Sequence, residues 1–345
     1  MGKALARYAM KDVFLVVDPR FERLFPSVSA NNVLRIASRN RSNLRVIKVL
    51  AKLIALLITR KPKVVVFAGV ATKTPFVLDV VTFFIVCKRF GFFREKRILV
   101  WVNKTFESEK GRIVGRIQTH HLKRIDKIIT YYKSSTEHLD AEHEGKFTFV
   151  PLPAFHVNQT RPQQAMKPYV FSGGESQRDF ASLVSAIRSF PVNLIISTLG
   201  VGEQHLDQSQ LPKGVCVKVG DRFNKGPEEY LSDLAGATVV VVPLLETNDP
   251  KGLTTIVEAL VYGKAIISTR SRGLDDYLQH GYNCLRVEAG NSRAYATAIK
   301  QLWTNDQLRT ELERGARATA KRLRVEYFDY EIKKIVTSLQ EQPLG

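Results

Sequence analysis

The sequence predicts an α/β protein built from two Rossmann-like domains, and three observations lead to this fold class. The chain has 345 residues, about twice the length of a typical single domain. Strand-like apolar runs alternate with helical patterns along it, which is typical of parallel sheets. Residues 1–167 contain 31 Lys and Arg against 12 Asp and Glu, whereas residues 168–345 contain 21 of each. The net charge of +19 therefore lies in the first half, which indicates that the halves have different partners.

The first half contains five expected strands and one long helical region. Its strands are expected at residues 13–17, 64–67, 98–102, 127–130 and 147–150. A basic helical region is expected between the first two of them, over about residues 30–59. Residues 151–168 contain four prolines and little periodicity, as a linker between domains does. We therefore expect an N-terminal domain over residues 1–155 and a linker over residues 156–168.

The second half repeats the alternation of strands and helices. Strands are expected at residues 169–171, 193–197, 215–218, 238–242 and 265–269. Helices are expected at residues 179–189, 227–234, 254–262 and 294–303, followed by a charged helical tail from residue 307. We expect a C-terminal domain over residues 169–325 and a C-terminal helix over residues 326–345.

Composition excludes several classes of protein. With 44% hydrophobic residues, both halves can bury a core, which excludes a mainly disordered chain. The three cysteines, Cys87, Cys216 and Cys284, have neither zinc-ligand nor C-x-x-C spacing, which favours a reducing cytoplasmic setting. Two apolar stretches, residues 46–58 and 76–86, are interrupted by charges and are shorter than the ~20 residues of a membrane span. We expect a cytoplasmic protein without a signal peptide or transmembrane helix.

The basic first half indicates an anionic partner. Residues 45–58 alternate cationic and apolar side chains at helical spacing, and residues 90–97 form a basic, aromatic cluster. Such surfaces bind anionic lipid, each basic residue contributing about 1 kcal/mol. The hypothesis is a protein peripheral to the cytoplasmic face of a membrane. The alternatives are apolar residues that are simply core and a basic face that only keeps the protein in solution.

The first chemical motif follows the strand at 169–171. Gly173 and Gly174 form a turn, and a helix begins shortly after Arg178. Backbone N–H groups of such a turn can approach a phosphate closely, and the guanidinium of Arg178 suits a diphosphate. The doublet is not a G-x-G-x-x-G fingerprint, and an ordinary turn is the alternative.

The second motif follows the strand at 238–242 and comprises Lys251, Gly252, Leu253, Thr254 and Thr255 at a helix start. Its backbone N–H groups, its threonine hydroxyls and the helix dipole can bind an anion. One turn later Glu258 can accept hydrogen bonds from a ribose diol. The alternative makes Thr254 an N-cap and Glu258 a solvated helix residue.

Together these segments resemble a known family. Residues 254–259 and 263–267, Gly273 and the run 281–283 look like the donor-binding block of family 4 glycosyltransferases (glycosyl transferases group 1). The Gly173–Gly174 turn with Arg178 resembles the phosphate-proximal turn of that domain. The likeness covers roughly residues 169–330. It implies a GT-B fold, with two Rossmann-like domains facing across a cleft and a C-terminal helix that crosses back to the N-terminal domain.

The resemblance implies transfer of a sugar from a nucleoside-diphosphate sugar to a glycan or lipid-linked acceptor, in polysaccharide or glycoconjugate biosynthesis. The diphosphate would lie against Gly173, Gly174, Arg178, Lys251, Gly252, Leu253, Thr254 and Thr255, and the ribose against Glu258. No Asp-x-Asp triplet occurs, so we expect neither a metal nor a cofactor. Retention of anomeric configuration is the family rule.

For the acceptor side the catalytic candidates are His120 and His121, because a histidine of the N-terminal domain reaches the cleft in resembling enzymes. A histidine could also act as a general base if the mechanism inverts the anomeric configuration. A pair of helix-surface histidines is the alternative. The family's first glutamate would fall at Pro250 here, with Asp249 or Glu246 as substitutes. The first strand is followed by Asp18 and Pro19 instead of a Gly-rich turn.

Other functions stay open at this point. Pro250 allows a catalytically inactive member, and an epimerase or phosphorylase shares the fold. A pI of about 9.9 would suit a nucleic-acid-binding protein, but the chain has no zinc spacing, aromatic RNP motif or basic zipper, so no nucleic acid is expected. A transferase saturates with one donor, whereas nucleic acid binds with a steep salt dependence.

Overall fold

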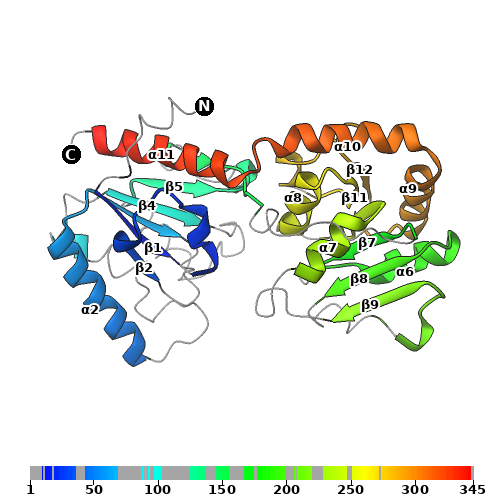
Figure 1. The fold of residues 1–345 in the computed structure, drawn as a ribbon, viewed down its shortest axis with the longest axis horizontal. Coiled ribbons are helices and arrows are strands. Elements are labelled where there is room, and N and C mark those ends of the chain that lie inside the picture. Colours follow the sequence, from blue (N-terminus) through cyan, green and yellow to red (C-terminus); the bar gives the residue numbers. More distant parts are fainter. Residues whose placement is uncertain are drawn as a thin grey trace. The chain divides into compact units, whose positions relative to one another are not determined.

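The structure is a computed structural model, and the contacts divide it into two units (Figure 1). It describes residues 10, 12–17, 19–35, 43–68, 87–88, 90, 92–93, 97–102, 125–136, 145–154, 167–174, 177–198, 206, 208–219, 228–246, 251–271 and 273–342. One unit comprises Met1–Pro151 and Val325–Gly345, and the other comprises Leu152–Arg324. Among the described residues, no helix has the length and apolar character that a membrane crossing requires.

The first unit is built on a six-stranded parallel sheet in the order β2-β1-β3-β4-β5-β6. The strands are β1 (Val13–Val17), β2 (Val33–Arg35), β3 (Val64–Ala68), β4 (Arg97–Val102), β5 (Lys127–Thr130) and β6 (Phe147–Phe149). Three 3₁₀ helices lie at Pro19–Leu24, Ala30–Asn32 and Lys133–Thr136. Every residue of β1 and β3 is buried, which explains why these strands are continuous apolar runs.

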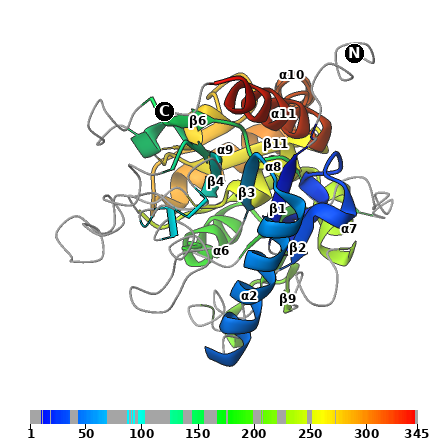
Figure 2. The ribbon, with the colours of Figure 1, turned by 90° about the vertical axis from the view of Figure 1, so that its left-hand side faces the viewer.

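Among the described residues, two helices cover this sheet. Figure 1 and Figure 2 show α2 (Asn43–Arg60) and α11 (Val325–Glu341) on opposite faces. In α2, Leu53 and Leu57 are buried one turn apart, as in an amphipathic helix. The last helix, α11, packs on β3 and β4. The chain therefore returns to the first unit at its C-terminus, as the expected fold requires.

One expectation for the first half is wrong. The helical region expected over about residues 30–59 begins only at Asn43, and residues 33–35 form strand β2. Val33 pairs in parallel with Leu15 of β1. Pairing with a buried strand thus overrides the local helical pattern, because β propensity depends mostly on the tertiary neighbours.

The second unit contains a second six-stranded parallel sheet, in the order β12-β11-β10-β7-β8-β9. The strands are β7 (Val170–Gly173), β8 (Leu194–Thr198), β9 (Val215–Val219), β10 (Val239–Val242), β11 (Ala265–Thr269) and β12 (Leu285–Val287). The sequence did not indicate β12, which has three residues with Arg286 at its centre. The two sheets confirm the predicted α/β class.

In the described part of the second unit, five helices surround the sheet: α6 (Phe180–Ser189), α7 (Glu228–Gly236), α8 (Leu253–Val261), α9 (Ser292–Thr304) and α10 (Asp306–Ala320). Short 3₁₀ helices lie at Gln208–Gln210 and Leu274–Asp276. The main core lies between the sheet and the pair α6 and α9, with α7 and α8 on the other face (Figure 1). The helical tail expected from residue 307 consists of α10, which ends at Ala320, and α11, which begins at Val325, one residue before the expected C-terminal helix.

A buried ion pair fixes α11 in the first unit. Asp329 and Lys333 lie one helical turn apart, 4% and 9% exposed, and their charged atoms are 2.9 Å apart. The same carboxylate oxygen accepts a 2.6 Å hydrogen bond from the hydroxyl of Ser27, 302 residues earlier in the chain. This contact joins the two ends of the sequence.

Asp329→Ala should lower the free energy of unfolding by about 3 kcal/mol, because it leaves the buried ammonium of Lys333 without its partner. Urea denaturation measures the change. Glu331→Ala, which removes the more exposed pair with Lys334 on the same helix, should lower it by less than about 1 kcal/mol. Equal effects of the two substitutions would contradict this account.

Candidate functional site

The candidate site lies where the strand order of the second sheet reverses. β7 is followed along the chain by β8 on one side, and β10 by β11 on the other. In open α/β sheets ligands bind at the carboxyl ends of the strands beside such a switch point. β7 ends at Gly173 and β10 at Val242, so both sequence motifs begin at this point.

The first motif forms a tight turn around a buried arginine. Arg178 is 7% exposed, and its Nε donates a 3.0 Å hydrogen bond to the carbonyl of Gly173. Gly174 has a φ of +118°, and a Cβ there would collide with the guanidinium of Arg178. The glycine therefore provides both the backbone conformation and the space that the guanidinium occupies.

The second motif begins α8 next to the same arginine. Gly252 is the N-cap residue, with a φ of 79°, and a Cβ on it would lie 2.9 Å from Cγ1 of Val242. No side chain caps this end; the helix starts at Leu253, so Thr254 is not the N-cap. The first N–H groups of a helix have no partner within it, and with the helix dipole they favour an anion.

Thr255 joins the two motifs from inside the protein. Its hydroxyl lies 2.9 Å from that of Tyr230 and 3.3 Å from the carbonyl of Gly173, and Nη2 of Arg178 lies 3.5 Å away. The side chain is 1% exposed. The hydroxyl is therefore engaged within the protein, and its binding of the anion stays a prediction. The backbone N–H of Thr255 belongs to the first turn of α8.

Tyr230 of α7 is a residue that sequence analysis missed. Its ring contacts that of Phe171 edge to face, with centroids 5.3 Å apart. A Cβ on Gly173 would lie 2.5 Å from this ring, so the glycine lets the tyrosine reach Thr255. A tyrosine in an expected helix far from either motif offers no sequence signal for this contact.

The remaining predicted donor residues differ in exposure. Lys251 and Thr254 are half-buried, and Leu253 is buried. Glu258 is 0% exposed, which excludes the alternative of a solvated helix residue. Its ribose-binding role stays a prediction, and it requires the surrounding side chains to move apart.

Several predicted positions lie outside the described residues. These are His120, His121, Asp249 and Pro250. Glu246, the other substitute for the missing glutamate, is exposed just beyond β10. Among the described residues, no group of three or more His, Cys, Asp or Glu side chains could hold a metal ion. The expectation of a metal-independent site stays a prediction.

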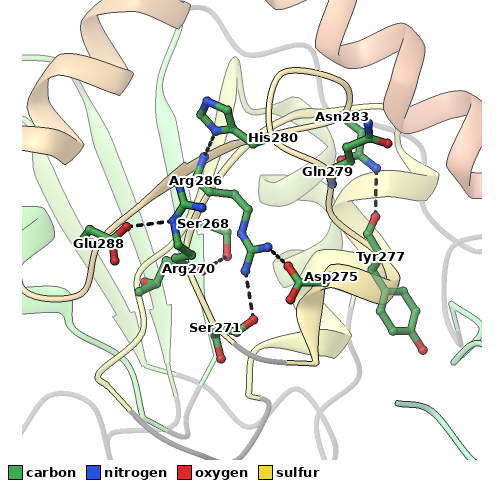
Figure 3. A network of polar contacts seen from close by, with 11 residues as sticks. Ser268, Arg270, Ser271, Asp275, Tyr277, Gln279, His280, Asn283, Arg286 and Glu288 are labelled. Carbon is green, nitrogen blue, oxygen red and sulfur yellow. Dashed lines mark hydrogen bonds and ion pairs between the residues drawn. The ribbon is translucent and has the colours of Figure 1, made fainter. Parts of the chain in front are cut away.

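Asn283 of the 281–283 motif belongs to a polar network that holds the turn between β11 and β12 (Figure 3), and Gly273 is the N-cap residue of the 3₁₀ helix of that turn, with a φ of 84°. Asn283 accepts a hydrogen bond from the N–H of Gln279 and donates one to the carbonyl of Tyr277. Figure 3 also shows the side chain of Arg286 pointing to Asp275 and the carbonyl of Ser271. These contacts are internal, so the motif residues shape the turn.

A known protein family matches part of the second unit. Residues 176–305 match the family model described as glycosyl transferases group 1. The predicted resemblance to group 1 glycosyltransferases is confirmed. The match spans α6 to the end of α9 and includes Arg178 and the whole of α8.

Two curated relatives match part of the chain. One is the lipopolysaccharide core biosynthesis glycosyltransferase LpsE of Rhizobium meliloti (strain 1021), 30% identical over 151 residues, which are 43% of each chain. The other is the D-inositol 3-phosphate glycosyltransferase of Corynebacterium urealyticum, 27% identical over 168 residues, covering 47% of this chain and 39% of the relative. Less than half of each relative's length is therefore matched.

Solved structures resemble the chain over nearly its whole length. A glycosyltransferase from Rickettsia africae ESF-5 has a TM-score of 0.70 at 12% identity, covering 96% of this chain and 99% of that one. Anabaena Alr3699/HepE in complex with UDP-glucose has a TM-score of 0.70 at 13% identity, covering 94% and 99%. WaaG, a glycosyltransferase involved in lipopolysaccharide biosynthesis, has a TM-score of 0.62 at 11% identity, covering 94% and 99%. The chain has the GT-B fold.

Gly174→Ala should destabilise the protein by about 3 kcal/mol in urea denaturation, because the added methyl both strains the backbone and displaces the guanidinium of Arg178. Gly290→Ala is the control: its φ is also positive, at +70°, but nothing lies within 4 Å of an added Cβ. It should cost only about 1 kcal/mol. Arg178→Ala in the Gly174→Ala background should recover part of the loss, and a purely additive result would contradict the proposed collision.

Proposed function

We propose that the protein transfers a sugar from a nucleoside-diphosphate sugar to a glycan or lipid-linked acceptor, in polysaccharide or glycoconjugate biosynthesis. One observation carries this proposal: a buried guanidinium lies at the switch point of the second sheet, between a glycine turn and the uncapped start of α8. Arg178 and the backbone N–H groups at the start of α8 thereby converge where a diphosphate is expected.

The chemistry requires stabilisation of a leaving nucleoside diphosphate. The acceptor oxygen bonds to the anomeric carbon as the bond from that carbon to the phosphate oxygen breaks. Negative charge grows on the leaving diphosphate, which takes up the proton of the acceptor hydroxyl. We propose that Arg178, Lys251 and the N-terminus of α8 stabilise that charge and that no metal takes part. We propose retention of anomeric configuration from the family resemblance, with His120 and His121 as candidates on the acceptor side.

The comparisons support the choice of donor. The Anabaena protein with the same fold has been solved with UDP and with UDP-glucose. UDP-sugars are therefore the first donors to test, ahead of GDP-, ADP- and dTDP-sugars.

Arg178→Ala should weaken binding of UDP-glucose or another accepted donor at least tenfold, because a charge-assisted contact to the diphosphate contributes about 1.5–3 kcal/mol. Isothermal titration calorimetry measures the affinity. The matched control is Arg188→Ala, which removes an exposed arginine from the helix that follows and should leave binding unchanged.

Release of nucleoside diphosphate in the presence of acceptor then separates an active enzyme from a binding protein. Donor binding without any turnover would favour the catalytically inactive alternative that Pro250 raises. A wild-type protein that folds but binds none of these donors would refute the proposal.

We propose further that the acceptor lies at an anionic membrane surface. The first half contains the whole charge surplus, and Ile58, Phe90 and Phe92 expose 59%, 73% and 65% of their surface. Cationic residues attract anionic headgroups, and exposed aromatic side chains can enter the interface between headgroups and acyl chains.

Phe90→Ser with Phe92→Ser should lower the partition coefficient onto vesicles of phosphatidylglycerol and phosphatidylcholine about tenfold or more, because burying a phenylalanine contributes about 1.5–3 kcal/mol. Co-sedimentation measures it. Val219→Ser, at a residue 57% exposed in the neutral half, is the control and should have no effect. Equal binding of the wild type to pure phosphatidylcholine, or no loss at raised salt, would refute the anionic-surface proposal.

A further inference from the structure

The segment 243–245 follows β10 and makes hydrogen bonds on two sides. On one side it pairs with the residues around Arg178. The N–H of Asp179 donates to the carbonyl of Pro243 at 3.1 Å, and the N–H of Leu245 donates to the carbonyl of Gln177 at 3.0 Å. Arg178 itself forms an isolated antiparallel bridge with Leu244. The position of the segment 243–245 therefore sets that of the arginine backbone.

On its other side the same segment is held by Thr269, the last residue of β11. The hydroxyl of Thr269 accepts a 2.6 Å hydrogen bond from the N–H of Leu244, and its oxygen lies 3.3 Å from the carbonyl of Leu244. Tyr295 of α9 places its own hydroxyl 2.6 Å from that of Thr269. Both side chains are almost fully buried, at 1% and 0% exposure.

The hydrogen-bonding capacity of this threonine is fully used. Burial raises the pKa of Tyr295 to about 12, so the phenol keeps its proton at neutral pH and can donate it to Thr269. The threonine then accepts from Tyr295 and from the N–H of Leu244, and its one proton is directed at the carbonyl of Leu244. No solvent can replace these contacts, because all three residues are buried.

Thr198 provides an internal comparison. It is the last residue of β8, as Thr269 is of β11. Ile196 and Ile267, two residues earlier, belong to the core under α6 and α9, so both threonines project to that face. Thr198 is 3% exposed, and its hydroxyl has no hydrogen-bond partner among the described residues. A buried threonine at a strand end thus does not by itself hold a loop.

We propose that Thr269 and Tyr295 are positioning residues for diphosphate binding, acting on Arg178 through the segment 243–245. The inference rests on the proposed function, since it assigns to this pair the alignment of the donor site. Without the threonine hydroxyl the N–H of Leu244 has no acceptor, and the segment shifts to find one. Arg178 moves with the segment, and a displacement of about 1 Å at such a site can lower activity by about a hundredfold.

Calorimetric titration with UDP tests the inference in the full-length protein. Thr269→Val removes only the hydroxyl and should weaken UDP binding about tenfold, and Tyr295→Phe should weaken it by a smaller factor. Thr269→Ser keeps the hydroxyl and should bind within about twofold of the wild type. Thr198→Val is the matched control, an identical substitution at a strand end without a hydroxyl contact, and should bind like the wild type.

A double-mutant cycle separates positioning from general loosening of the fold. In the Arg178→Ala background, Thr269→Val should have no further effect on UDP affinity, because the group that it positions is gone. Equal, additive losses in both backgrounds would overturn the inference, as would wild-type affinity in Thr269→Val. If Thr269→Val fails to fold, Tyr295→Phe completes the same cycle.

The outcomes for the two proposals are distinct. A wild-type protein that binds neither UDP nor GDP, ADP or dTDP overturns the proposed function and this inference with it. A wild-type protein that binds UDP while Thr269→Val and Tyr295→Phe bind it equally well overturns only the positioning role.

Discussion

The arrangement of the two glycine motifs in the second unit depends on the burial of the Arg178 guanidinium. An arginine side chain stays charged and has only donors, so Arg178 at 7% exposure requires acceptors and space from its surroundings. The carbonyl of Gly173 and the hydroxyl of Thr255 supply acceptors, and Gly174 supplies the space. Because Thr255 lies 77 residues further along the chain, this arrangement forces the first turn and the start of α8 together. This contact lies where the diphosphate is proposed to bind.

A layer of polar contacts supports the guanidinium at the carboxyl edge of the sheet. Within the strands the side chains facing α6 and α9 are mostly apolar, whereas the last inward positions are Ser172 in β7, Thr198 in β8 and Thr269 in β11. Thr269 connects α9 to the segment after β10, which in turn pairs with the backbone on either side of Arg178. Hydrogen bonds of this kind are strong in a dry interior and orient one another, so a helix on one face can align a group at the sheet edge.

The two halves of the sequence differ in net charge, and both ends of the chain belong to the first unit. The surplus of positive charge belongs to residues 1–167, whereas the donor motifs lie in the neutral half. The C-terminal helix α11 nevertheless packs in the first unit, where Asp329, Lys333 and Ser27 form a buried contact. Loss of one member of a buried ion pair is strongly destabilising. The contact with Ser27 therefore holds α11 in the first unit only while Asp329 and Lys333 are both present.

The sequence by itself determined the α/β class, most of the strands and the resemblance to group 1 glycosyltransferases. Buried parallel strands such as β3 are continuous apolar runs, and glycines that require positive φ, such as Gly174 and Gly252, stand out in a sequence. Only the tertiary structure decided that residues 33–35 form a strand, because their partner β1 is distant in the chain. It also decided the partners of the Thr255 hydroxyl and the contributions of Tyr230, Thr269 and Tyr295. Hydroxyl contacts between residues far apart in the chain leave no local pattern, since what each hydroxyl does depends on which atoms folding brings within hydrogen-bond distance.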